Sequence, residues 1–329
     1  MTIKYNNVYI NNTATITGPY EEKGPLGKYF DYSYKDLYFE TSSWEQAESK
    51  LINHAVDLVL AKSGITKNEI DALISGDLLN QLSSTNYASI NIPFSLIGVY
   101  AACATSTLSL AVASLLVEND NNKKIICATS SHNNSAEKQF RYPVEYGGPK
   151  PKTTTFTATG GVAAIVSSKK SNIKIESATI GKVIDSQIND VFNMGAVMAP
   201  AAADTIYKHL QDTGRKVDYY DLVLTGDLGI YGKKILKDYM QSEYNITLDN
   251  HKDSGLMLYD IENQPVYAGA SGSSCLPLVT YSYILKQMTE KKLKKVLLVA
   301  TGALHSQSMA NQKLTIPAIA HAISLEVVR

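Results

Sequence analysis

An internal repeat limits what this chain can fold into more than any other feature of its sequence. Residues 71–78 read DALISGDL, and 150 residues further on the similar string DLVLTGDL occupies residues 221–228. At the same displacement Gly64 falls on Gly214, so the segment before each string recurs as well. Other segments repeat at slightly different offsets, as changes in loop length would produce. The sequence therefore predicts two copies of one structural unit.

Each copy alternates predicted strands with predicted helices. In the first copy, apolar residues at helical spacing occupy residues 44–63, and a second helix is expected over 105–118. Short apolar strands are predicted over 72–74 and 123–129, and a further strand over 92–100. This alternation is typical of a mostly parallel sheet covered by helices on both faces, which defines an α/β fold.

The repeat divides the chain into an N-terminal half, residues 1–170, and a C-terminal half, residues 171–329. Within the first half, residues 131–159 have no counterpart of equal length in the second half. A long polar insertion directly after a core strand is a common place for binding groups. We therefore expect this insertion to carry part of any functional site.

Composition excludes several classes of protein. Lys and Arg together number 31 and Asp and Glu number 31, so the formal net charge of zero gives no support to a nucleic-acid-binding surface. The three cysteines are scattered and form neither a disulfide framework nor a metal-binding pair. No signal peptide is visible, and no stretch approaches the roughly 18 to 20 uninterrupted apolar residues of a membrane span.

Cys103 lies among small residues where a predicted strand meets a long apolar helix. At a helix N-terminus the partial positive charge and the unpaired amides favour a thiolate and can bind an anion. Acyl-transfer enzymes place a nucleophile in this way. The alternative interpretation is a buried structural cysteine, because free cysteine is among the most buried residue types.

A cysteine at a strand-to-helix junction, in a duplicated α/β chain of this length, resembles the thiolase and ketoacyl-synthase superfamily. Longer strings are similar to one branch of it, the stage V sporulation protein AD family of endospore-forming bacteria. This likeness runs from about residue 18 to about residue 326. The strings are SGDLLNQ at 75–81, ACATS at 102–106, ATSSHN at 128–133, QFRYPVEYGG at 139–148 and MAPAAADTI at 198–206.

This resemblance implies a thiolase-like fold of five layers, α-β-α-β-α, whose halves are related by a pseudo-twofold axis. It also implies a role without catalysis. Proteins of this family are expected to bind dipicolinic acid (pyridine-2,6-dicarboxylate), free or with calcium, during uptake into the developing spore and release in germination. The implied location is the forespore inner membrane, as a peripheral homodimer, with the other membrane proteins of the stage V sporulation A operon as partners.

The residues themselves argue against condensation chemistry. In the ketoacyl-synthase III pattern a histidine follows the second-half strand, where this chain has Gly226 or Asp227. The asparagine of that pattern follows a glycine, which here is Gly269, and the next residue is Ala270. A thiolate without these partners gives acyl exchange only. The alternative is an acyl-transferring enzyme with Cys103 as nucleophile and one of three histidines as base: His132, His305 or His321.

A planar dicarboxylate needs several charge-assisted donors, and arginine is the best single residue for this task. Arg141, with Lys138 beside it, is the candidate cation; the alternative is that Arg141 pairs with Glu137 or Glu145 at the surface. The predicted ligand-binding residues are Asp77, Cys103, His132, Lys138, Arg141, Glu145, Tyr146, Asp227, Ser271, Gly272 and His305.

No cofactor is expected, because the glycine-rich segments match neither a dinucleotide-binding nor a nucleotide-phosphate loop. No metal site is predicted with certainty, although Asp77, Asp185 or Asp227 could complete the oxygen shell of a calcium ion that accompanies the ligand. His321 is expected in the core.

Two further segments are predicted less directly. His251 lies in a polar segment and is expected in a solvated loop. The aromatic segment Tyr29–Phe39 is expected to pack over the core, with a partner-docking face as the alternative.

Overall fold

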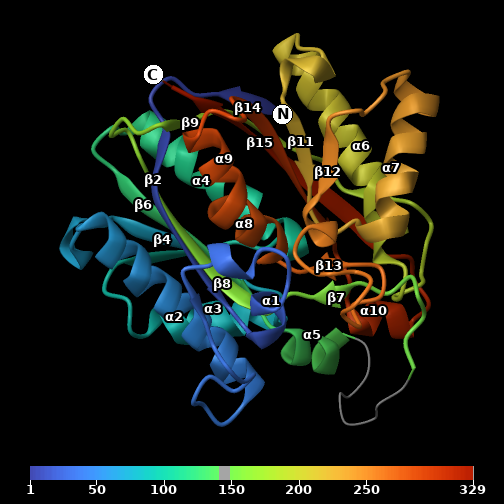
Figure 1. The fold of residues 1–329 in the computed structure, drawn as a ribbon, viewed down its shortest axis with the longest axis horizontal. Coiled ribbons are helices and arrows are strands. Elements are labelled where there is room, and N and C mark those ends of the chain that lie inside the picture. The colour runs from blue at the N-terminus through green and yellow to red at the C-terminus, as the bar shows by residue number, and fades with distance from the viewer. Residues whose placement is uncertain (141–148, 329) are drawn as a thin grey trace.

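The computed structural model describes residues 1–140 and 149–328, and these form five layers (Figure 1). Two parts of one continuous 13-stranded sheet, called the two sheets below, enclose a middle layer of helices, and each is covered by helices on its outer face. The middle helices are α4 (Thr105–Asn119), α8 (Cys275–Val279) and α9 (Leu285–Thr289); the outer helices are α2 (Trp44–Ser63) and α3 (Ser83–Ser89) on one side, and α6 (Met194–Thr213) and α7 (Gly229–Tyr244) on the other. This architecture confirms the predicted thiolase-like α/β fold.

The two halves have the same strand order. In the first half the order is β5 (Ser95–Gly98), β4 (Ala72–Gly76), β6 (Lys124–Ser131), β8 (Gly160–Ser167) and β2 (Tyr9–Thr17). In the second half it is β12 (His251–Asp253), β11 (Leu222–Thr225), β14 (Lys295–Ala303), β15 (Pro317–Val327) and β9 (Ile173–Ile180). The first three strands of each series are parallel to one another, and the fourth strand, β8 or β15, is antiparallel to both of its neighbours.

Smaller elements complete the chain. They are β1 (Thr2–Lys4), β3 (Tyr32–Ser33), β10 (Ile184–Asp185), the helices α1 (Pro19–Glu22), α5 (Asn133–Phe140) and α10 (Gln307–Asn311), and a separate two-stranded ribbon of β7 (Phe156–Thr157) and β13 (Ala270–Ser271). A π-helical turn over Thr280–Ile284 joins α8 to α9. The ribbon and α5 matter most for function, because both contribute to the cavity described below.

The repeated helices end in the same way in both halves. Gly64 follows α2 with a φ of 69°, and Gly214 follows α6 with a φ of 68°. This left-handed conformation suits glycine, which has no Cβ to clash with the backbone. At the other end of α2, the Ser43 side chain accepts a hydrogen bond from the Gln46 amide and so caps the helix. Local sequence therefore sets the length of α2.

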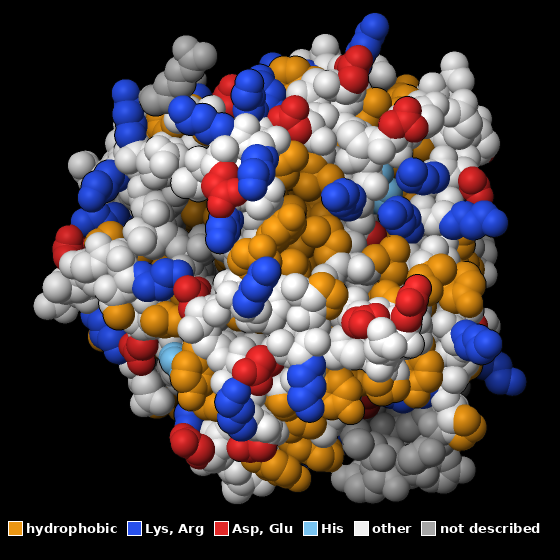
Figure 2. All heavy atoms as spheres, in the orientation of Figure 1, with side chains coloured by type: hydrophobic (Ala, Val, Ile, Leu, Met, Phe, Trp, Pro, Cys, Tyr) orange, Lys and Arg blue, Asp and Glu red, His pale blue; other side chains and the backbone are white. Residues whose placement is uncertain are grey.

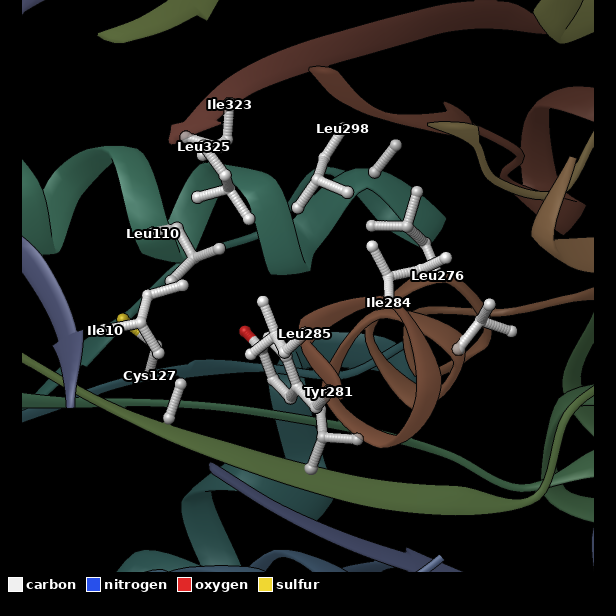
Figure 3. Packing of buried hydrophobic residues seen from close by; sticks show 14 of the residues in the cluster. Ile10, Leu110, Cys127, Leu276, Tyr281, Ile284, Leu285, Leu298, Ile323 and Leu325 are labelled. Carbon is white, nitrogen blue, oxygen red and sulfur yellow. The ribbon is translucent and has the colours of Figure 1, made fainter. Parts of the chain in front are cut away.

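The middle layer is the centre of the core. Figure 3 shows side chains from both sheets meeting those of the middle helices, among them Leu110 of α4, Leu276 of α8 and Leu298 of β14. Helix α4 is buried over most of its length because strands of both sheets pack against it. Residues 102–119 are long and apolar enough to cross a membrane, but 61% of that segment is buried within this fold. That burial is what a central core helix shows.

The structure departs from the sequence-based predictions in two places. The strand expected over 92–100 is shorter, since β5 covers only Ser95–Gly98. The prediction of a solvated loop for His251 is wrong: this residue lies in β12, is 4% exposed and contacts Thr225 through Nε2 at 2.8 Å. Strand β12 is only three residues long, and so short a segment gives no recognisable strand pattern in the sequence.

Two other expectations are confirmed. His321 is 2% exposed, and its Nδ1 accepts a hydrogen bond from the Gly181 amide. In the aromatic segment Phe39 is fully buried, while Tyr32 and Tyr38 stay about half exposed. On the face shown in Figure 2, basic and acidic side chains are interspersed, in keeping with the net charge of zero.

Substitution within α4 should separate core packing from helix propensity. Leu110 is 2% exposed and Leu115, on the same helix, is 40% exposed. We expect Leu110→Ala to lower the free energy of unfolding by about 2–5 kcal/mol, because it leaves a cavity in the middle layer. The matched variant Leu115→Ala should change it by about 0.5 kcal/mol or less. Chemical denaturation monitored by circular dichroism measures both; equal losses would contradict a central role for α4.

Candidate functional site

A cavity of about 60 Å³ lies where the two halves meet at the end of α4. Segments from both halves form its walls: the chain after β4 and the turn before α4, helices α5 and α6, the β7–β13 ribbon, and the chain at the end of β14. The lining residues are Leu78, Tyr100, Ala102, Cys103, Ala136, Phe140, Thr157, Met194, Met198, Ser271, Ala303 and His305. The duplication therefore supplies opposite walls of one site.

The turn that carries Cys103 is fixed by two close backbone contacts. A Cβ atom on Gly76 of β4 would lie 2.0 Å from the Val99 carbonyl oxygen, and one on Gly302 of β14 would lie 2.2 Å from the Ala101 carbonyl oxygen. Only glycine fits at either position. Ala102 has a φ of 49°, a left-handed conformation that is unusual for alanine. Such strain persists only when the surroundings enforce it, so the position of Cys103 is strongly determined.

Cys103 itself is partly exposed, in a 3-10 turn over Ala102–Ala104 that leads into α4. No side chain caps the N-terminus of α4. The first-turn amides of a helix have no intrahelical acceptors, and together with the helix dipole they favour an anion. Ser106, in the same turn, is 4% exposed and its hydroxyl has no hydrogen-bond partner among the described residues. The preceding 3-10 turn supplies acceptors to the amides of Ala104 and Thr105, so the thiol lies at a helix end where the Ser106 hydroxyl is the spare donor seen among the described residues.

Three of the predicted ligand-binding residues are brought together in the cavity wall: Cys103, Ser271 and His305. The His305 ring lies edge-on to Phe140, with ring centroids 5.7 Å apart. Gly272, next to Ser271, does not line the cavity and has a φ of 113°. A Cβ there would lie 2.7 Å from the Ser131 hydroxyl oxygen, so glycine is needed for packing between the halves.

His132 lies outside the cavity wall and is fully buried. Its Nε2 lies 2.8 Å from the Leu37 carbonyl oxygen, and its Nδ1 accepts a hydrogen bond from the Asn134 amide. Burial lowers the pKa of His132 to about 4, so the ring is neutral at physiological pH. Its contacts tie α5 to the chain around residue 37, which is a structural task.

The predicted acidic residues Asp77 and Asp227 also lie behind the wall, fully buried. Asp77 accepts hydrogen bonds from the amides of Leu79 and Thr85 at 2.8 and 2.7 Å. Neither oxygen of Asp227 has a hydrogen-bond partner among the described residues. Burial, and secondarily Asp253, raises the pKa of Asp227 well above its usual value. Neither carboxylate is placed to touch a ligand directly.

One of the predicted cations, and part of the insertion at 131–159, lie outside the residues that the structure describes. Lys138 of α5 is exposed and pairs with Glu45 at 2.7 Å, and it does not line the cavity. Arg141, Glu145 and Tyr146 lie outside the described residues. Of the insertion, α5 and the strand β7 do contribute to the cavity, through Phe140 and Thr157 among others.

No metal centre forms in the described part of the chain. No group of three or more His, Cys, Asp or Glu side chains there is arranged to hold an ion. Asp185 lies at the surface, where it accepts hydrogen bonds from Gln187 and Thr315. It is not grouped with Asp77, which is buried.

Sequence reasoning missed the apolar half of the wall. Tyr100 and Ala102 lie beside Cys103 in the sequence, and Met198 lies in one of the unusual strings, so proximity and pattern could have indicated them. Phe140 likewise lies in one of these strings, at 139–148. Met194 carries no such signal, and it reaches the cavity only because α6 approaches it in the folded chain.

Comparison with known proteins gives a consistent result. The family described as stage V sporulation protein AD matches residues 1–326 of this chain. A curated relative, the stage V sporulation protein AD of Bacillus subtilis (strain 168), is 47% identical over 319 residues, which cover 97% of this chain and 94% of the relative.

Solved structures of low sequence similarity share the fold. Cerulenin-bound OleA of Xanthomonas campestris has a TM-score of 0.63 at 13% identity, and the match covers 99% of this chain and 100% of that chain. The 3-oxoacyl-[acyl-carrier-protein] synthase III of Aquifex aeolicus has a TM-score of 0.55 at 13% identity and covers 97% of this chain and 99% of its own. At such identity the likeness bears on the fold alone.

Proposed function

Since the chain belongs to the stage V sporulation protein AD family, we propose that it serves sporulation by binding dipicolinic acid in the Cys103 cavity. In this proposal the protein is a binding protein and not an enzyme. It holds the ligand, free or as the calcium chelate, for uptake into the developing spore and for release in germination.

The observation that carries the proposal is a cavity at an uncapped helix end without condensation machinery. The uncapped amides of α4 suit a carboxylate, and the thiol of Cys103 forms a compact wall beside them. Asp227, where the ketoacyl-synthase III pattern places a histidine, is buried outside the cavity. Ala270, where that pattern places an asparagine, is fully buried in β13.

The size of the cavity implies that its walls move when a ligand enters. A cavity of about 150 Å³ is known to hold a benzene molecule, whereas this cavity measures about 60 Å³. Three of its lining residues have long or rotatable apolar side chains: Phe140, Met194 and Met198. Methionine adapts to new shapes at small cost, so rotation of these side chains can make room for a pyridine ring.

Titration calorimetry with dipicolinate tests this function. We expect heat of binding for the unmodified protein. Cys103→Trp should give none, because the indole fills the cavity. The small variant Cys103→Ser should bind within about threefold of wild type, because one altered thiol contact is worth about 0.7 kcal/mol. Isophthalate, which lacks the ring nitrogen, serves as the matched ligand. Absence of heat at millimolar dipicolinate would refute the proposal.

A second candidate function rests on two residues that share the cavity wall. Cys103 and His305 line the same cavity, so a nucleophile and a base are available for acyl transfer. If this activity exists, intact-mass spectrometry after incubation with acyl-coenzyme A should show an adduct on wild type and none on Cys103→Ser. An unchanged mass for wild type would argue for ligand binding alone.

We also propose that the protein is a homodimer held at the inner membrane of the spore by the other stage V sporulation A-operon proteins. The support for the dimer is the free edge of β5. Close to this edge four apolar residues are 36–76% exposed: Tyr87, Ile90, Leu96 and Tyr100. An unpaired strand edge flanked by apolar side chains is suited to pairing with a second copy.

Light scattering should therefore give a mass of twice 35.9 kDa for the wild-type chain. Leu96→Lys, on β5, should shift it to the monomer, because a charge there opposes burial at the shared edge. The matched variant Leu115→Lys, on a residue of similar exposure in α4, should leave the dimer intact. A monomeric wild-type protein at micromolar concentration would contradict this arrangement.

A further inference from the structure

Four buried carboxyl groups lie next to segments that carry lining residues of the Cys103 cavity. They belong to Glu21, Glu48, Asp77 and Asp227, and each of these residues is 0% exposed. In residues 1–140 and 149–328, no Lys, Arg or His side chain lies within ion-pair distance of any of them. A buried carboxylate without a cation is costly, so such groups tend to hold a proton.

Asp77 and Glu48 lie next to two parts of the cavity wall, the chain at Leu78 and helix α5. Asp77 precedes the lining residue Leu78, and Glu48 accepts hydrogen bonds from Ser130 and from Ser135 of α5, at 3.4 and 2.5 Å. Burial raises the pKa of both carboxyls, and their mutual repulsion, with Glu45 nearby, raises that of Glu48 further.

The effect of Asp77 also reaches a lining residue. Tyr100 has its pKa raised to about 12 by burial, then by Cys103 and Asp77. Asp77 therefore lies close to this residue of the cavity wall.

Glu21 supports the ribbon wall. Its Oε1 accepts hydrogen bonds from the Thr159 amide, at 2.9 Å, and from the Tyr259 hydroxyl, while Oε2 has no partner among the described residues. Thr159 lies two residues from the lining residue Thr157. Burial raises the pKa of Glu21 to about 7, and the hydrogen bonds from Thr159 and Tyr259 oppose this. Two other titratable groups lie near this pair in the described part of the chain, the buried thiol of Cys275 and the hydroxyl of Tyr20.

Asp227 supports the wall formed by Ser271. It lies close to Gly272, which follows Ser271, and to the buried thiol of Cys275, with Asp253 as the charged neighbour. Asp253 is held differently, because its oxygens accept hydrogen bonds from the amides of Leu228 and Gly229 at the start of α7. Asp227 accepts no hydrogen bond from helix amides among the described residues, so its ionised form is less stabilised than that of Asp253 and it is the carboxyl that favours the protonated form.

The part of the wall formed by residues 1–140 and 149–328 carries no lysine or arginine. An anion in the cavity would be repelled by ionised carboxylates behind the walls and would favour their protonated forms. We propose that the cavity binds its dicarboxylate together with protons taken up by the carboxyl groups behind its walls. This inference rests on the proposed function, and it adds the mode of regulation: affinity falls as pH rises.

The direction of the pH dependence follows from the repulsion between the bound anion and the ionised carboxylates. An anion nearby raises the pKa of each carboxyl, so binding takes up protons wherever the free protein is partly ionised. For Glu21 that window is centred near pH 7. We expect the dissociation constant for dipicolinate to increase about tenfold between pH 6 and pH 8, which corresponds to an average uptake of about half a proton.

Calorimetry in two buffers tests the inference on the unmodified protein. At pH 7 without calcium, heats measured in phosphate and in Tris should differ, because these buffers release protons with different enthalpies and dipicolinate itself is fully ionised. Equal heats in the two buffers would overturn the proton linkage while leaving the binding function intact. No heat in either buffer would overturn both.

Isosteric variants identify which carboxyl groups take up the protons. Glu21→Gln keeps an acceptor for Thr159 and Tyr259 but cannot ionise, so it should show a smaller buffer difference and a flatter pH profile. Glu22→Gln, at the neighbouring partly exposed residue that pairs with Lys35, should match wild type. Glu48→Gln and Asp227→Asn extend the test to the other walls. A buffer difference that stays unchanged in all three buried-site variants would overturn the assignment to these carboxyls.

Discussion

Close approach of backbone to backbone is the constraint on which the rest of the site depends. The turn before α4 lies between β4 of the first half and β14 of the second, and glycines at 76 and 302 are what let both strands come so near. This contact fixes the thiol of Cys103 from two sides and opens the N-terminus of α4 toward the interface between the halves. The cavity is consequently a product of the duplication, because neither copy alone could position this turn.

Much of the fold could be read from the sequence because its signals are local or repeated. The matching strings at 71–78 and 221–228 identify β4 and β11, and the glycines that end α2 and α6 follow from their backbone conformation. The site was harder to predict. Cys103, Ser271 and His305 do meet, but Asp77 and His132 turn away to bond backbone groups. Which way a side chain points at the end of a strand depends on tertiary contacts that residue spacing does not encode.

The two copies have diverged most where their matching carboxylates lie. In the first half Asp77 holds the amides that follow β4, whereas in the second half the equivalent task belongs to Asp253, which reaches in from β12. This substitution frees Asp227 from any structural duty, and its backbone adopts a φ of 73° that places it beside Cys275. A residue kept in such an unfavourable setting is compatible with a role in the site and is hard to explain by stability alone.

Strands β2 and β9 pair where the two sheets join, at Tyr9 with Lys174 and Ile10 with Ile173. Strand β1 of the N-terminal half also pairs with β9, and the β7–β13 ribbon links the halves again. The shared helices of the middle layer add apolar packing to these backbone pairings. Since α4 packs on strands of both halves, removing either half would expose its apolar surface. The chain should accordingly melt as one cooperative unit, and its two halves could not have been separate monomeric proteins with their present surfaces.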